Sequence, residues 1–244
     1  MALSTLENVQ GWFTLIFVVI SVILGIVISL KYFSTKNKQM ILIGLTWIGL
    51  VSPYFADTIS FIVINFFGGS ALPDVPYFFL SNFFLPFVHI TWLYFIADFL
   101  YKEHKKSIII IVLIESIAFE IIFLYLLIFD PSTLGTRVST FYVNWELIVL
   151  LYLLLSIALF LITGILFSRV CFKSTSKEIN LKGYILIIAY LSFTVGVSLD
   201  VIFTPPLQTE LTLAISRIIL TTAAIEFYLG FTMPMWLKNM LLKK

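Results

Sequence analysis

Charged residues are scarce in this chain of 244 residues, because Asp, Glu, Lys and Arg together make up only 11% of it. A soluble domain usually carries about 25% of these residues. Hydrophobic residues make up 61% of the sequence, and the mean hydropathy is +1.09. The composition therefore excludes an ordinary soluble protein, and we expect the lipid bilayer to surround most of the chain.

Cysteine and histidine are also rare. Cys171 is the single cysteine, so no internal disulfide can form, and His89 and His104 are too few for a histidine-rich metal site. The patterns GxxxxGK[ST], GxGxxG, HExxH, CxxC and GxSxG do not occur. We expect no catalytic residues, no bound metal and no cofactor, and hence a protein that is not an enzyme.

The apolar residues gather in seven runs, each long enough for a helix that crosses a membrane, for which about 20 residues are needed. No run alternates polar and apolar residues as a membrane β-strand would, so helices are favoured over a barrel. The expected segments are 11–33, 40–67, 77–101, 108–129, 145–168, 183–203 and 211–233. The sequence predicts an all-α, seven-helix membrane protein.

The basic residues predict the orientation of these helices. Thirteen of the fifteen Lys and Arg residues fall in the turns 31–39, 102–107 and 169–182 and in the C-terminal tail, all on one side. Arg137 lies in a loop on the other side, and Arg217 lies within the last helix. By the positive-inside rule, the N-terminus is outside and the C-terminus is cytoplasmic. Because the lysines are spread at about three per turn, we assign them to topology and lipid headgroups and expect no nucleic-acid binding.

The connections between the apolar runs are short. We therefore expect a single membrane domain over 1–244 without a separate soluble domain. The first run does not resemble a cleavable signal peptide, because "MALSTLENVQ" before it has no Lys or Arg and carries Glu7. The longest outer loop, "DPSTLGTRVSTFYVN", either folds over an opening or merely connects two helices, and the connector is the favoured interpretation.

Ionisable residues inside the expected helices are the main candidates for function. Each charge near a helix centre costs about 2.5–3.5 kcal/mol on insertion. Five unpaired carboxylates would then cost more than the net stability of a typical protein, so some should be paired or protonated. The residues in question are Asp57, His89, Glu115, Glu120, Asp200, Arg217 and Glu226.

Depth along the helices sorts these residues into two groups. Asp57, Asp200 and Arg217 fall in the outer half, and we expect Arg217 to pair with Asp200, with Asp57 as the alternative. Arginine stays charged at accessible pH and needs an anion, whereas a glutamate can take up a proton.

The second group lies near the middle of the membrane and consists of His89, Glu120 and Glu226. We interpret these residues as candidates for an intramembrane polar or proton-linked site. Glu226 is expected to be protonated and hydrogen-bonded to neighbouring helices.

Two prolines should bend the helices that carry these residues. Pro53 precedes Asp57 by one turn and Pro86 precedes His89, and each removes a backbone donor, which predicts a kink. Kinks beside ionisable residues indicate a polar cavity in the outer half of the bundle. The competing interpretation is that the polar stripes serve only helix packing.

The segment "LIGLTWIGLVSPYFADTISFI" and the overall layout resemble uncharacterised prokaryotic seven-helix membrane proteins. They are also similar to the seven-helix sensor portion of membrane histidine kinases without its output domain. A retinal protein is excluded, because "LTLAISRIILTTAAIEFYLGFTM" has no lysine to link retinal. The DRY and NPxxY patterns of G-protein receptors are absent as well.

Three functions remain open at this point. A sensor or receptor-like protein of the cell membrane would bind a small or lipidic ligand in the outer half and act through a membrane or cytoplasmic partner. An ion- or proton-coupled transporter would need a polar path from Asp57 through Glu120 and Glu226. A structural or assembly subunit of a membrane complex would need only a fixed ion pair.

Overall fold

The computed structural model describes residues 3–205 and 207–242 and consists mostly of helices. The first half contains α1 (Thr5–Thr35), α2 (Gln39–Val51), η1 (Ser52–Tyr54), α3 (Phe55–Phe67), α4 (Asp74–Asn82), α5 (Leu85–Leu100), η2 (Lys102–His104) and α6 (Lys105–Phe129). The second half contains η3 (Pro131–Thr133), β1 (Gly135–Ser139), β2 (Tyr142–Trp145), α7 (Leu147–Phe172), α8 (Lys177–Ile202), α9 (Glu210–Thr232) and α10 (Met235–Leu242).

Seven helical segments of the described chain are long and apolar enough to cross a membrane. They confirm the seven expected runs, and the protein is a multi-pass integral membrane protein. Some helices begin earlier than their apolar part, as α1 does at Thr5, where the Ser4 and Glu7 side chains cap the first turn. Which end faces the cytoplasm stays a prediction from the basic residues.

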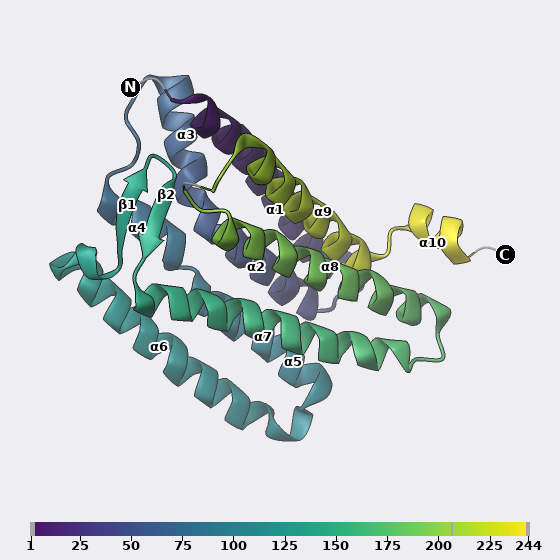
Figure 1. Ribbon diagram of the computed structural model, residues 1–244. Coiled ribbons are helices and arrows are strands. Elements are labelled where there is room, and N and C mark those ends of the chain that lie inside the picture. The colour runs from purple at the N-terminus through teal and green to yellow at the C-terminus, as the bar shows by residue number, and fades with distance from the viewer. Residues whose placement is uncertain (1–2, 206, 243–244) are drawn as a thin grey trace.

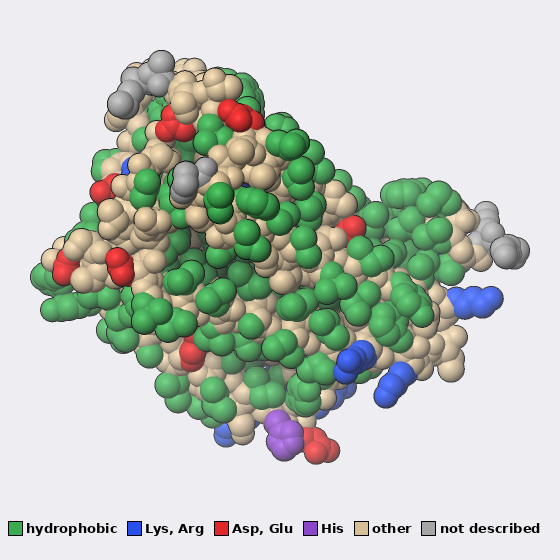
Figure 2. Space-filling model, viewed as in Figure 1, with side chains coloured by type: hydrophobic (Ala, Val, Ile, Leu, Met, Phe, Trp, Pro, Cys, Tyr) green, Lys and Arg blue, Asp and Glu red, His purple; other side chains and the backbone are tan. Residues whose placement is uncertain are grey.

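The helices pack as one bundle with two distinct ends (Figure 1). α1, α2, α8 and α9 form the closely packed part, α7 lies against α8, and α6 lies at the margin against α5. We call the end that carries β1 and β2 the hairpin end, and the end that carries the α7–α8 turn and α10 the lysine end. Most of the visible Lys and Arg side chains gather at the lysine end, and hydrophobic side chains cover much of the face between the two ends (Figure 2).

Large aromatic side chains fill the middle of the bundle. Trp47 stacks on Phe227 with ring centroids 4.4 Å apart, and Trp92 contacts Phe160 at 5.0 Å and Tyr190 at 5.9 Å. Lipid tails are as apolar as these rings, so the helices are held together by close van der Waals packing rather than by a hydrophobic effect between helices. This aromatic layer is the packed centre of the fold.

Two spans are interrupted near their prolines. The 3₁₀ segment η1 contains Pro53 and separates α2 from α3. The third span breaks at Phe83 and Phe84, so that α5 begins at Leu85 with Pro86 in its first turn. Proline is tolerated there because the first turn of a helix has no intrahelical acceptor for its N–H.

The loop between α6 and α7 is a β-hairpin, which corrects its interpretation as a plain connector. β1 and β2 pair antiparallel from Gly135 opposite Trp145 to Ser139 opposite Tyr142, with an irregularity after Arg137. The hairpin packs on α4, α6 and α7 through buried Leu134 and Val143. The sequence expectations also missed α10, which follows the seventh span and leaves the bundle (Figure 1).

Candidate functional site

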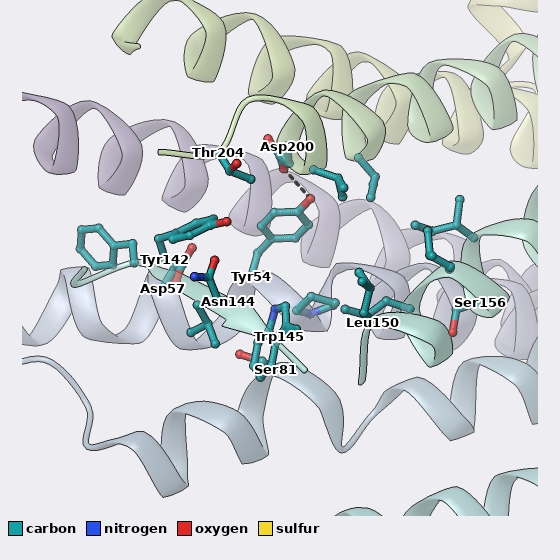
Figure 3. A pocket seen from close by; sticks show the side chains of 18 of the residues that line it. Tyr54, Asp57, Ser81, Tyr142, Asn144, Trp145, Leu150, Ser156, Asp200 and Thr204 are labelled. Atoms are coloured by element: carbon teal, nitrogen blue, oxygen red, sulfur yellow. Dashed lines mark hydrogen bonds between the residues drawn. The ribbon is translucent and has the colours of Figure 1, made fainter. Parts of the chain in front are cut away.

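A cavity of about 460 Å³ opens within the hairpin end of the bundle. Residues of η1 and of every long helix except α6 line it, and five consecutive hairpin residues from Phe141 to Trp145 complete its wall. Figure 3 shows the hairpin side chains Tyr142, Asn144 and Trp145 arranged around Tyr54. All three members of the expected outer group, Asp57, Asp200 and Arg217, line this same cavity.

Arg217 and Asp200 form an ion pair at the wall of the cavity. Arg217 is only 3% exposed, its Nη1 donates to Asp200 Oδ2, and its Nε donates to the Thr14 hydroxyl at 2.9 Å. Tyr54 and Ser216 also donate to Asp200, at 2.8 and 2.6 Å, and the guanidinium lies over the Tyr54 ring. The guanidinium thus has the anion and the hydrogen-bond acceptor that a buried cation requires, and the Tyr54 ring adds a cation–π contact.

Asp57 occupies a different position in the cavity and forms no ion pair with any residue that the structure describes. Its Oδ1 accepts a hydrogen bond from the Tyr77 hydroxyl, and no hydrogen bond to its Oδ2 is found among the described residues. Asp57 is only 5% exposed, yet its side chain lines the cavity. The structure therefore pairs Arg217 with Asp200 and leaves Asp57 with a phenol alone.

Arg137 and Gln10 fix the hairpin over the cavity. Arg137 donates to the carbonyls of Leu72 and Thr140 and lies 3.5 Å from the Asp74 carboxylate. Buried Gln10 on α1 donates to the Phe141 carbonyl at 3.0 Å. In the sequence, Arg137 stands out only as the exception to the charge pattern, and nothing marks Gln10. Their importance depends on the hairpin, which the sequence analysis did not predict.

His89 belongs to a separate polar cluster deeper in the bundle. Its Nδ1 lies 3.1 Å from Glu115 Oε2 and 3.3 Å from the Tyr152 hydroxyl, and its Nε2 lies 2.8 Å from the Ser156 hydroxyl. Ser156 also lines the cavity, so it connects the cluster to the cavity wall. Glu115 was recognised as intramembrane but was not predicted to be the partner of His89.

Glu120 and Glu226 do not join either group. Both carboxyl oxygens of Glu120 are buried and have no hydrogen-bond partner in the described part of the chain, and the same holds for Glu226 Oε2. The Glu226 carboxyl nevertheless lies against Ser192 of the neighbouring helix α8, and its protonation stays a prediction. Glu120 lies on the marginal helix α6 and Glu226 on α9, and these helices are not packing partners, so the expected path through both residues is not continuous.

A second cavity of about 580 Å³ lies at the lysine end. It is mostly apolar, it contains Cys171 and Phe95, and Lys173 and Lys182 contribute to its lining. No pattern in the sequence indicated this cavity.

The aromatic layer separates the two cavities. Along α2, Leu50 lines the first cavity and Ile43 the second, with Trp47 between them. Along α8, Phe193 and Leu186 line the two cavities in the same way. The packed rings therefore divide the interior into two compartments.

The first cavity has the size and the lining that are typical of small-molecule sites. Small-molecule sites typically measure about 300–1,000 Å³ and combine apolar walls with a few polar groups, as this cavity does. No group of three His, Cys, Asp or Glu side chains within residues 3–205 and 207–242 is placed to hold a metal ion.

Comparisons with protein families, curated proteins and solved structures find no match for this chain. A function for this chain therefore has to be inferred from the size, charges and lining of the first cavity.

Proposed function

We propose that this chain is a sensor or receptor-like protein of the cell membrane that binds a small or lipidic ligand in the first cavity. The single observation that supports this proposal is the cavity itself, which combines the Arg217–Asp200 pair and Asp57 with an aromatic wall beneath an anchored hairpin. With the lysine end in the cytoplasm, the cavity would open toward the outside.

A response to the ligand would reach the cytoplasmic side through α8 and α9. Asp200 and Arg217 sit at the cavity on these two helices, which pack against each other along the bundle. At the lysine end α9 leads into α10, and Lys238 of α10 is ion-paired with Glu178 of α8. A change at the cavity would therefore alter the position of α10, which offers a surface to a membrane or cytoplasmic partner protein.

A pair of valines on α8 provides the test. Val197 lines the cavity, whereas Val195 is exposed on the outside of the bundle. A small-molecule library is screened by thermal unfolding of the purified protein. Compounds that raise the unfolding temperature of the wild type should lose this effect in Val197→Trp, which fills the cavity, and keep it in Val195→Trp. Compounds that stabilise both variants equally, or a library without any effect, would count against the proposal.

The second cavity supports one alternative, an ion- or proton-coupled transporter. Two cavities on opposite sides of a packed layer would serve as the outer and inner vestibules of a transporter in which this layer opens and closes. Ion or proton flux in proteoliposomes tests this function, and loss of flux in Glu226→Gln would connect it to the intramembrane carboxyl. Absence of flux in liposomes that hold folded protein would favour the receptor-like function.

A further inference from the structure

We propose that the first cavity selects an organic monocation, an amine in its ammonium form or a quaternary ammonium. This inference rests on the proposed ligand-binding function and specifies the chemical class of the ligand. It follows from the charges, the open acceptor and the aromatic wall of the cavity.

The charges that line the cavity do not balance. Its charged side chains are two aspartates, Asp57 and Asp200, and one arginine, Arg217. Arg217 is committed to Asp200, to Thr14 and to the Tyr54 ring. When both aspartates are ionised, one negative charge remains, and it lies on Asp57.

Among the described residues, Arg137 is the other arginine at this end, and it does not neutralise Asp57. Its side chain donates to the carbonyls of Leu72, Ser139 and Thr140 and lies near Asp74. It covers a face of the Tyr77 ring, with the guanidinium carbon 4.4 Å from the ring centre, and it is not part of the cavity lining. The cavity side of Asp57 is therefore left for a ligand.

Asp57 offers this ligand an acceptor that the protein does not use. The side chain is 95% buried and lines the cavity, and its Oδ2 has no hydrogen-bond partner among the described residues. A buried carboxylate is costly to leave without a counter-charge. An ammonium group would supply the charge and, if it carries N–H groups, the hydrogen bond as well.

The aromatic wall favours the same class of ligand. Tyr142 and Trp145 of the hairpin face the cavity together with Tyr54 (Figure 3). Aromatic faces attract cations, and the recognition of quaternary ammonium groups commonly uses several rings. A bare metal ion would leave most of the 460 Å³ empty, so an organic cation is the better match.

The experiment compares three probes of similar shape by isothermal titration calorimetry on the full-length protein in detergent. Phenethylammonium carries a positive charge, 2-phenylethanol is neutral, and 3-phenylpropanoate is negative. Benzyltrimethylammonium serves as the quaternary probe. We expect the two cations to bind most tightly, with at least about a tenfold advantage over the neutral compound, since a hydrogen bond or contact to a charged group is worth about that much.

Asp57→Asn is the decisive variant, because it keeps the shape of the side chain and removes the charge. It should weaken the binding of phenethylammonium about tenfold or more and leave that of 2-phenylethanol unchanged, which also shows that the cavity is still folded. Asp130→Asn removes the same charge from an exposed position at the same end and should leave both affinities unchanged. To test the ring contact, Tyr142 is replaced. Tyr142→Leu should weaken the binding of benzyltrimethylammonium several-fold, whereas Tyr142→Phe should leave it unchanged.

Three kinds of result would overturn the inference. Equal cation affinity in Asp57→Asn and the wild type would remove the role of the carboxylate, and a preference for 2-phenylethanol or 3-phenylpropanoate would reverse the selectivity. Failure of both cations to bind at millimolar concentration would also overturn it. The proposed ligand-binding function survives each of these results if other compounds respond to Val197→Trp, so the two proposals fail separately.

Discussion

The two ends of the bundle use charge in opposite ways. At the hairpin end, Asp57, Asp200 and Arg217 lie inside the protein around a cavity. At the lysine end, Glu178 pairs with Lys182 and with Lys238, whose side chain is 44% exposed. A buried charge is costly without a counter-charge, whereas exposed charges are screened by water and ions and can be in excess. This difference fits the proposed functions of the two ends, ligand binding at the hairpin end and orientation in the membrane at the lysine end.

The largest effects should come from breaking the buried pair. Asp200→Leu should lower the free energy of unfolding by about 3–5 kcal/mol, because Arg217 then stays charged and buried without an anion. Arg217→Leu should cost less, since Asp200 keeps its hydrogen bonds from Tyr54 and Ser216 and can take up a proton. Reversible unfolding of the purified protein in detergent measures both losses.

The double variant completes a double-mutant cycle, which measures the interaction between the two side chains. Because the two side chains interact directly, the loss in Arg217→Leu with Asp200→Leu should be smaller than the sum of the single losses by about 2 kcal/mol. Thr14→Val removes only the third contact of Arg217 and should cost about 1 kcal/mol. Losses at positions 200 and 217 that simply add would show that the pair does not stabilise the hairpin end.

Intermediate effects on stability are expected on α6, which carries one glutamate with a polar partner and one without. Glu115→Leu removes the partner of buried His89 and should destabilise the protein by about 1–3 kcal/mol. Glu120→Leu removes a carboxyl whose two oxygens have no hydrogen-bond partner among the described residues, and it should raise stability by about 1 kcal/mol. Unfolding temperatures of the two variants provide the comparison. Equal losses in both would mean that Glu120 has an interaction comparable with that of Glu115.

The smallest effect should occur at the lysine end. Lys238→Ala removes an exposed ion pair, and Glu178 keeps Lys182 at 3.2 Å, so stability should change by about 0.5 kcal/mol or less. Limited proteolysis of α10 should nevertheless become faster, because this contact ties α10 to α8. A loss comparable with that of Asp200→Leu would remove the distinction between the two ends.

The seven spans and the Arg217–Asp200 pair could both be predicted from the sequence. Seven long apolar runs leave little choice of fold, and a short turn between α8 and α9 puts residues near their facing ends at similar depth. A buried arginine must find an anion, and Asp200 was the nearest one at that depth. The composition, the depth of each residue along its helix and the permanent charge of arginine were enough for these two predictions.

The hairpin and the contacts it creates were not accessible in this way. "GTRVSTFYVNW" has a weak strand pattern, and its fold depends on distant partners such as Gln10 of α1. Which phenol meets Asp57, and which glutamate meets His89, depends on the rotation of each helix about its axis. Depth alone does not fix rotation, which is also why Glu120 and Glu226 were placed on one path.

The helix α10 has a consequence for how the protein sits in bilayers of different thickness. It leaves α9 through Met233, and Met235, Trp236 and Met240 are more than half exposed along it. A short helix with an exposed apolar side and a tryptophan settles at the boundary between headgroups and acyl chains. α10 should therefore act as an interfacial helix that keeps the lysine end at a constant depth relative to the lipid headgroups. A thinner or thicker bilayer would then be accommodated at the other end, and the mouth of the cavity would shift relative to the lipid surface.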